Sequence, residues 1–279
     1  MTTVLDARTI TLDDGVTVAY RELGTGPAVL LLHGWPTSSL LWRGVMPGLA
    51  AQSRVVALDL PGFGGSDKPV DVHYDFGLFE RAIDGVLSGL GIGEVGVVAH
   101  DIGGPIAVHW ALQQPSRVTK IALLNTLLYP ELSDAVIDFL ATLGSPARRG
   151  SLTSAESLTE IMRLGVADPD VLTDDVLAGV RAPFTTDADR LALANAGIGL
   201  SVEGLAEIAA GLPTLRMPVR AIYGVQDRIL PEVADTMARL ARDVPQAEVT
   251  ALADVGHFLQ EEDPDQVADL LARFFAASS

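Results

Sequence analysis

The stretch 95–111 constrains the fold of this chain more than any other. Val95–Val98 is too apolar to alternate, which indicates a strand buried on both faces of a parallel sheet. Apolar residues recur at helical spacing over Ile106–Ala111, and Pro105 is tolerated in the first turn of a helix. Small residues two places before and two places after Asp101 allow a sharp turn between strand and helix. The pattern therefore predicts an α/β fold with the Asp101 side chain exposed above the sheet.

Strand and helix patterns alternate on both sides of this stretch. Two alternating segments flank the turn signal Asp13-Asp14-Gly15 and predict an antiparallel hairpin at one edge of the sheet. A helix is expected over 79–90, and Asp263 has the position of a cap for the final helix. The predicted strands are Arg8–Leu12, Val16–Glu22, Ala28–Leu32, Val55–Leu58, Val95–Val98, Val118–Asn125, Val219–Gly224 and Ala247–Leu252.

Residues 126–214 differ from the rest, because helical signals follow one another there and no β-branched apolar strand occurs. Helix starts are predicted at Thr153 with Glu156, at Thr173, and at Asp187 or Asp189. We therefore expect an α/β core formed by residues 1–125 and 215–279, with residues 126–214 inserted as a helical cap.

Charge and composition exclude several classes of function. The chain has 36 acidic and 19 basic residues, and its formal charge of -17 disfavours nucleic acids, anionic membranes and anionic substrates. It has no cysteine, so disulfides and thiolate metal sites are excluded. Met1 to Ile10 does not read as a signal peptide, and no apolar run approaches a membrane span. We expect a cytoplasmic protein that acts on small neutral molecules.

Several short stretches together resemble one known family. They are the His-Gly-x-Pro stretch His33–Pro36, the turn Pro61–Ser66, the His-Asp-x-Gly-Gly stretch His100–Gly104, Asp227 and Gly256-His257. On these residues the chain resembles an α/β-hydrolase with an aspartate nucleophile, and it is most similar to epoxide hydrolases and to haloalkane and haloacetate dehalogenases. The resemblance covers nearly all of the chain outside the cap. It implies a mostly parallel eight-stranded sheet flanked by helices, with an inserted helical cap.

The resemblance gives three residues a catalytic role. Asp101 is the nucleophile, His257 the base that activates water, and Asp227 the acid that holds the imidazole. A carboxylate with a reference pKa of ~3.9 is ionised at neutral pH. Asp101 could therefore attack saturated carbon directly and form an alkyl ester, which water then hydrolyses. Asp227 has an alternative role as the cap of a helix near Pro231, and Asp254 is a rival acid.

The surroundings of the reacting carbon are expected from the same resemblance. The backbone amides of Trp35 and Ile102 are the candidate donors to an oxyanion. The indole N–H of Trp35 is a candidate donor to a leaving group, with an apolar wall as the alternative. Asn125 occupies the place where some relatives carry the acid, and it is expected to hydrogen-bond near the pocket. The remaining substrate-binding candidates are Tyr129, Phe139 and Phe184.

Ile102 bears on the substrate class. Haloalkane dehalogenases characteristically place tryptophan directly after the nucleophile, and haloacetate dehalogenases place arginine there. Epoxide hydrolases fit better, although they usually carry cap tyrosines and this cap has only Tyr129, at its start. We expect epoxide hydrolysis of small neutral apolar substrates, with haloalkane or haloacid dehalogenation as the first alternative and non-catalytic ligand binding as the second. No cofactor or metal is expected, and the oligomeric state, including a homodimer, is open.

Overall fold

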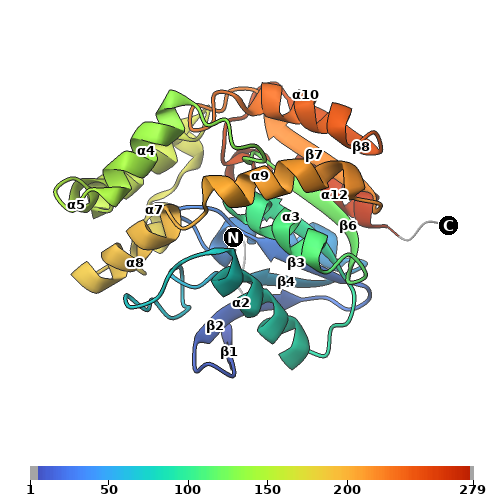
Figure 1. The fold of residues 1–279 in the computed structure, drawn as a ribbon, viewed down its shortest axis with the longest axis horizontal. Coiled ribbons are helices and arrows are strands. Elements are labelled where there is room, and N and C mark those ends of the chain that lie inside the picture. Colours follow the sequence, from blue (N-terminus) through green and yellow to red (C-terminus); the bar gives the residue numbers. More distant parts are fainter. Residues whose placement is uncertain (1–5, 277–279) are drawn as a thin grey trace.

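The structure is built on one mixed sheet. The computed structural model describes residues 6–276. Its strands lie in the order β1-β2-β4-β3-β5-β6-β7-β8, and only the pairs β1–β2 and β2–β4 are antiparallel. This sheet confirms the predicted fold class and the predicted edge hairpin (Figure 1). The strands are β1 (Arg8–Thr11), β2 (Thr17–Leu23), β3 (Ala28–Leu32), β4 (Arg54–Leu58), β5 (Val95–His100), β6 (Val118–Leu124), β7 (Val219–Gly224) and β8 (Ala247–Leu252).

Helices cover both faces of the sheet, which is why its central strands are apolar throughout. Alternate residues of β3 point to opposite layers. Leu30 and Leu32 pack in the cluster that contains α2, α3 and α10, whereas Val29 and Leu31 pack in the cluster that contains α1, α11 and α12. The helices outside residues 126–214 are η1 (Ser39–Trp42), α1 (Met46–Ala50), α2 (Phe76–Gly89), α3 (Gly103–Gln113), α10 (Val233–Asp243), α11 (Leu259–Glu262) and α12 (Pro264–Phe275).

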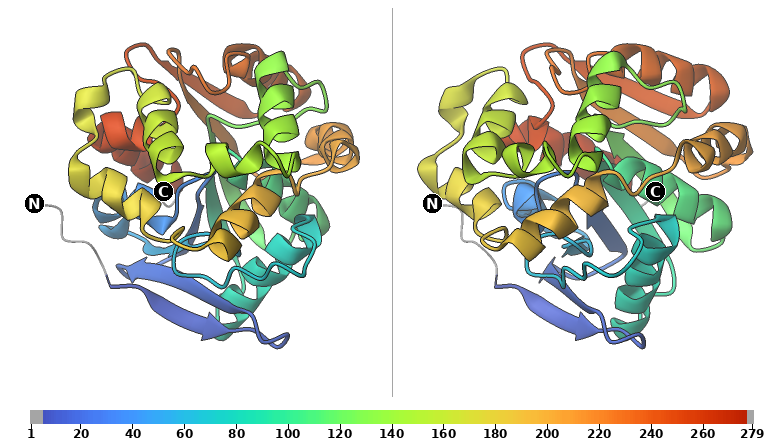
Figure 2. Two further views of the ribbon diagram at one scale, coloured as in Figure 1. Left: turned by 90° about the vertical axis from the view of Figure 1, so that its left-hand side faces the viewer. Right: turned by 60° about the vertical axis from the view of Figure 1, so that its left-hand side comes forward.

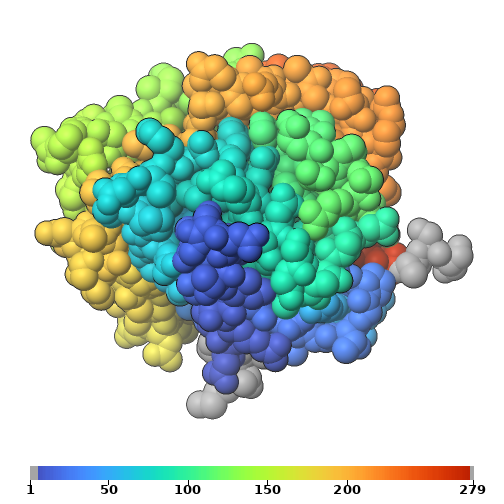
Figure 3. Space-filling view, turned by 60° about the horizontal axis from the view of Figure 1, so that its bottom comes forward, coloured from blue at the N-terminus to red at the C-terminus, as the bar shows by residue number. Residues whose placement is uncertain are grey.

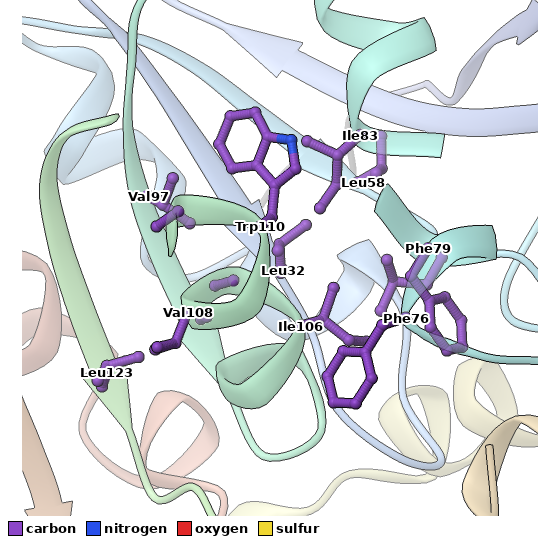
Figure 4. Close-up of a cluster of buried hydrophobic side chains, with 14 of the residues drawn as sticks. Leu32, Leu58, Phe76, Phe79, Ile83, Val97, Ile106, Val108, Trp110 and Leu123 are labelled. Atoms are coloured by element: carbon purple, nitrogen blue, oxygen red, sulfur yellow. The ribbon is translucent and has the colours of Figure 1, made fainter. Parts of the chain in front are cut away.

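The larger cluster holds the helix that follows Asp101 against the sheet. Figure 4 shows Ile106, Val108 and Trp110 of α3 between side chains of the sheet and of α2. Trp110 is 1% exposed, and its indole N–H donates to Asp84 at 3.0 Å. Burial of a large aliphatic side chain contributes roughly 1.5–3 kcal/mol, so this packing fixes the start of α3 below the turn at Asp101.

The segment 126–214 contains helices and no strand among its residues, all of which the structure describes. Its helices are α4 (Asp134–Gly144), α5 (Arg149–Leu152), α6 (Ala155–Leu164), η2 (Pro169–Val171), α7 (Asp174–Arg181), α8 (Asp187–Gly197), α9 (Val202–Gly211) and η3 (Leu212–Thr214). Figure 2 shows α4 to α8 gathered on one side of the molecule. By contrast, α9 packs against α3 in the helical layer of the sheet. We refer to 126–201 as the helical insertion.

Side-chain caps set the helix starts in this segment. Thr173 caps α7, as predicted. The prediction was wrong by one residue at α6, where Ser154 rather than Thr153 accepts the capping hydrogen bond. It was also wrong at α8, where Thr186 is the cap and Asp189 completes the capping box. In both helices a hydroxyl one residue away from the predicted cap takes the position from which it can accept an amide hydrogen bond.

The β1–β2 hairpin lies on the outside of the molecule beside α2, as Figure 3 shows. Within residues 6–276 no single helix is long and apolar enough to cross a membrane. Within these residues, one pair of consecutive helices, α8 and Val202–Thr214, together has the length and composition of a membrane span, and the two helices are bent by 43° at the break between them. The expectation that no signal peptide is present rests on Met1 to Ile10, and residues 1–5 of that stretch lie outside the described part of the chain.

Candidate active site

The sharp turn predicted after β5 is present at Asp101. Its φ of 51° lies in the left-handed region, which few residues other than glycine adopt. Its N–H donates to the carbonyl oxygen of Asn125 at 3.1 Å, and its own carbonyl oxygen accepts from the hydroxyl of Thr126 at 2.6 Å. A Cβ at Gly104 would lie 1.9 Å from that hydroxyl oxygen, so a larger residue does not fit there. Contacts with the end of β6 thus hold the strained turn.

The Asp101 carboxylate lies against the backbone that follows β3. Oδ1 accepts a hydrogen bond from the backbone N–H of Trp35 at 2.8 Å. This approach requires glycine at position 34, because a Cβ on Gly34 would lie 2.2 Å from Asp101 Cβ. Burial raises the pKa of Asp101, while the charge of His257 and the backbone N–H groups of Ile102 and Trp35 act to lower it. Two amides therefore favour the ionised form of a buried carboxylate.

His257 faces Asp101 from the loop after β8. Its Nδ1 donates to Asp227 Oδ2 at 2.8 Å, and its Nε2 lies 3.6 Å from Asp101 Oδ2. Nε2 has no hydrogen-bond partner within the described residues. Burial acts to lower the pKa of His257, but the charges of Asp227 and Asp101 outweigh it and raise the pKa. With Nδ1–H bound to Asp227, the neutral imidazole presents its free lone pair at Nε2 toward Asp101.

Asp227 performs two tasks at once. Oδ1 accepts from the backbone N–H groups of Ile229 and Leu230, each at 2.8 Å, so it caps the turn before Pro231. Oδ2 binds His257. Burial acts to raise the pKa of Asp227, yet the charge of His257 and these hydrogen bonds hold the pKa below its usual value. The alternative role of Asp227 as a helix cap was wrong, because α10 begins only at Val233 with Glu232 at its N-cap, and Oδ1 holds the preceding turn instead.

Asn125 supports Asp227 and does not reach the cavity. Its Nδ2 donates to Asp227 Oδ2 at 2.6 Å, and its Oδ1 accepts from the N–H of Gly224 at 2.9 Å. Its φ of 33° ends β6 one residue earlier than predicted. The interpretation of Asn125 as a substrate-binding residue was wrong, because both ends of its amide are bound within the protein. Asp254, the rival acid, is exposed and makes no ion pair or hydrogen bond within the described chain.

Two further histidines near Asp101 are held by the backbone. His33 Nε2 accepts from the N–H of Leu60 at 3.0 Å, and its Nδ1 lies 2.9 Å from the carbonyl oxygen of Gly34. His100 Nε2 lies 2.9 Å from the carbonyl oxygen of His257. Burial lowers the pKa of both rings, and that of His100 lies well below its usual value. Both are neutral structural residues that fix the loops around Asp101.

A cavity of about 300 Å³ opens above Asp101. Its wall is mostly apolar and is shared by the core and the helical insertion. Among the lining residues, Asp101, Asp138 and Arg228 carry charge and Thr142 carries a hydroxyl. The apolar lining residues are Trp35, Ile102, Pro105, Leu127, Leu132, Ala135, Val136, Phe139, Leu140, Leu152, Ile161, Leu164, Gly197, Leu200, Leu205, Ile229, Leu230 and Phe258. Such a lining suits an apolar ligand with few polar groups.

Trp35 and Phe139 both line this cavity, in agreement with their predicted positions. Their rings meet edge to face, with centroids 4.8 Å apart. The indole N–H of Trp35 donates to the carbonyl oxygen of Leu193 at 3.2 Å. The interpretation of this indole as a leaving-group donor was therefore wrong, and its ring forms an apolar wall.

Tyr129 and Phe184 do not line the cavity, so their assignment to substrate binding was also wrong. The Tyr129 hydroxyl donates to Asp243 Oδ2 at 2.9 Å, and the guanidinium of Arg239 lies 3.8 Å from the centre of its ring. Phe184 is 5% exposed and packs in the larger apolar cluster. Tyr129 thus joins the insertion to the core helix α10, and Phe184 is a residue of the hydrophobic core.

Arg228 and Thr142 were missed by the sequence analysis although both line the cavity. Arg228 directly follows Asp227, and this position is the signal that could have identified it. Its guanidinium also donates to the carbonyl oxygen of Val166. Thr142 lies in α4 without a recognisable motif. The described residues contain no group of three or more His, Asp or Glu side chains suited to a metal ion.

Comparisons with known proteins agree with this fold. The model of the alpha/beta hydrolase fold family matches residues 27–264. The soluble epoxide hydrolase of a Corynebacterium species is 30% identical over 94% of this chain and 95% of its own length. The 2-hydroxymuconate semialdehyde hydrolase of a Pseudomonas species is 28% identical over 94% and 91%. The haloalkane dehalogenase DbeA of Bradyrhizobium elkani superposes with a TM-score of 0.86 at 26% identity, covering 97% of each chain. The chain belongs to the α/β-hydrolase family and is a hydrolase.

Proposed function

We propose that this hydrolase opens small apolar epoxides through a covalent ester on Asp101. One observation carries the proposal: a buried carboxylate faces an apolar cavity and has an imidazole nitrogen 3.6 Å from one oxygen and a backbone amide 2.8 Å from the other. A carboxylate of this kind attacks saturated carbon without a base, whereas a hydroxyl nucleophile needs one.

In the first step Asp101 Oδ2 attacks a ring carbon of the epoxide from the side opposite the C–O bond. That bond breaks with its electron pair on the oxygen, which takes a proton from solvent water and becomes a hydroxyl. Oδ1 stays with the Trp35 amide and becomes the carbonyl oxygen of the ester. This step needs ionised Asp101, and burial raises the pKa of that group. Ester formation should therefore slow at acid pH, as Asp101 becomes protonated.

In the second step water attacks the carbonyl carbon of the ester and gives a proton to His257 Nε2. The negative charge then develops on Oδ1, where the N–H groups of Trp35 and Ile102 stabilise it. The bond between the carbonyl carbon and the alkyl oxygen breaks, the proton passes from His257 to that oxygen, and the diol leaves. The Asp101 carboxyl group then returns to solvent the proton that the first step consumed. Asp227 stabilises the imidazolium. One epoxide and one water give one diol, and the enzyme is regenerated.

The leaving group decides between the epoxide and the second candidate, a carbon–halogen bond. The likeness to DbeA favours that second candidate. Against it, the residue after Asp101 is Ile102 and the Trp35 indole is bound to Leu193, so neither side chain donates to a halide. The side-chain donors that remain in the cavity lining are Arg228 and Thr142, and each can hydrogen-bond to a developing alkoxide or to a halide, so the adduct formed in the trapping experiment decides between the two candidates.

The test traps the ester. The variant His257→Gln is mixed with styrene oxide or with bromohexane, and the intact protein and its Asp101 peptide are weighed. We expect the mass of the whole epoxide to accumulate on Asp101, because ester formation does not need His257. His73→Gln replaces an exposed histidine and is the matched control, which turns over without accumulating ester.

Each other outcome points to a different function. An alkyl adduct with release of bromide, and none with the epoxide, would replace the lead by a dehalogenase. No adduct with either compound, together with saturable binding, would favour the non-catalytic ligand-binding protein. An adduct that persists in Asp101→Asn would contradict the assignment of the nucleophile.

A further inference from the structure

The segment that follows α6 is bonded directly to the backbone of His257. The carbonyl oxygen of Gly165 accepts from the N–H of His257 at 2.6 Å and from the N–H of Phe258 at 3.1 Å. This segment belongs to the helical insertion, whereas His257 follows the last strand of the core. Helix α6 also supplies Ile161 and Leu164 to the cavity wall. The main chain of the proposed base is thus tied to the helix that lines the substrate side.

Glu262 joins the same two segments with its carboxylate. Oε2 accepts from the N–H of Gly256 at 2.6 Å, directly before His257. Oε1 accepts from the N–H of Ala167 at 2.7 Å and from that of Asp168 at 3.2 Å. Hydrogen bonds to an ionised acceptor contribute more than neutral ones. A single half-buried carboxylate therefore receives three backbone donors from the loop of the base and from the insertion.

Glycines on both sides let the two segments approach this closely. A Cβ on Gly256 would lie 2.6 Å from the carbonyl oxygen of Gly165, and a Cβ on Gly165 would lie 2.4 Å from the ring of Phe258. Close packing leaves little room for the segments to shift independently. Neither glycine contact involves Glu262, so the close packing and the hydrogen bonds of the Glu262 carboxylate hold the same junction independently.

We propose that Glu262 is a positioning residue for His257. It fixes the main chain at Gly256 and couples the base to the 165–168 segment, so that His257 Nε2 stays aimed at the ester carbonyl while the cavity wall is in place. Glu262 makes no hydrogen bond or ion pair with Asp101, whose carboxylate is held by the backbone N–H of Trp35. This inference rests on the proposed function, and it assigns Glu262 to the hydrolysis step alone.

The experiment separates the two steps in Glu262→Gln. Glutamine keeps one oxygen acceptor but replaces the other carboxylate oxygen by an NH2 group. That NH2 group is a donor and faces a backbone N–H, which loses its acceptor. A displacement of the base by a fraction of an ångström slows proton transfer, and we expect ester hydrolysis to fall roughly 10- to 100-fold. Ester formation should stay within about threefold of the parent rate, as measured by rapid quench with styrene oxide. The share of esterified enzyme at steady state should rise accordingly.

Glu261→Gln is the matched control. It makes the same substitution on the same helix and breaks the pair with Arg43, in which the two nitrogen–oxygen distances are 2.7 Å and 2.5 Å. A purely structural role would slow both steps, or would affect both variants alike, and either result would overturn the proposal.

Amide hydrogen exchange tests the junction without any substrate. We expect faster exchange at 165–168 and 256–258 in Glu262→Gln than in Glu261→Gln. Unchanged exchange there would also overturn the proposal, including in the event that Glu262→Gln is too unstable for kinetics. If the parent enzyme and His257→Gln form no ester, the proposed function fails, whereas the exchange result still reports on the coupling.

Discussion

Asn125 is the position where one substitution should test the site most directly. Asn125→Ala removes the hydrogen bond to Asp227 Oδ2 and leaves the N–H of Gly224 without its acceptor. Both groups are buried, so water does not replace the lost partner without rearrangement. The residue also has a φ of 33°, which alanine adopts less readily than asparagine.

The size of the effect follows from these contacts. Loss of a hydrogen bond to a charged group costs about 1.5–3 kcal/mol, and a buried N–H left without a partner costs about 1–3 kcal/mol. The two losses share one side chain, so we expect the free energy of unfolding of Asn125→Ala to fall by about 3–5 kcal/mol. This is a large part of the roughly 5–15 kcal/mol that is typical of a native domain.

Urea denaturation at pH 7 measures this difference, and Asn195→Ala is the control. Asn195 is the other asparagine of the chain and has no side-chain hydrogen bond among the described residues, so its replacement should change stability by less than ~0.5 kcal/mol. The pKa of Asp227 is held low in the folded protein, so its stabilisation is present above the unfolded pKa and is lost as pH falls through the folded pKa. The deficit of Asn125→Ala should therefore shrink in acid. A loss no larger than that of Asn195→Ala would refute the reasoning.

Two further predictions concern the turn and the imidazole. Gly104→Ala should destabilise the protein by about 1–3 kcal/mol in the same assay, because its Cβ would meet Thr126 Oγ1 at 1.9 Å, whereas Gly150→Ala, with open space around it, should be neutral or stabilising. The pKa of His257, followed by NMR, should be lower in Asp101→Asn than in the parent and unchanged in Asp254→Asn, because the charge of Asp101 raises it. Since the pKa of His257 is raised in the folded protein, protonated His257 stabilises the fold below its unfolded pKa, and this contribution is lost as pH rises through the folded pKa. An unchanged His257 pKa in Asp101→Asn would contradict the ion pair between the two side chains.

The strands of the sheet were largely predictable from sequence. β3, β7 and β8 have the predicted bounds. For β3 and β7 the reason is that an apolar run closed by glycine or a polar residue is a local signal for a buried strand, whereas β8 is a mostly exposed edge strand. The start of α2 was placed three residues late, since Asp75 caps it before the apolar periodicity becomes evident. Errors in the insertion have the same origin, because adjacent Ser, Thr and Asp residues compete for one cap position.

The candidate site likewise contains residues that were predictable from sequence and residues that were not. Asp101 and His257 lie in compact motifs, so their proximity could be expected once the order of the parallel strands was known. The role of Tyr129 could not be predicted, because it depends on a hydrogen bond to Asp243, which is far away in sequence. The indole of Trp35 was misjudged for the same reason, since its acceptor Leu193 lies in a helix that approaches only in the folded chain. Arg228 escaped notice because no periodicity marks a residue that borders a cavity.

The bond from Trp35 to Leu193 has a consequence for how molecules enter. It bridges the loop after β3 and the helix α8, and Gly197 one turn further along lets α8 lie against the same ring, where a Cβ would come within 3.1 Å of the indole nitrogen. The Trp35 ring forms one side of the cavity and is hydrogen-bonded to α8 of the helical insertion. A ligand wider than the cavity can therefore bind only if α8 moves away from the loop after β3.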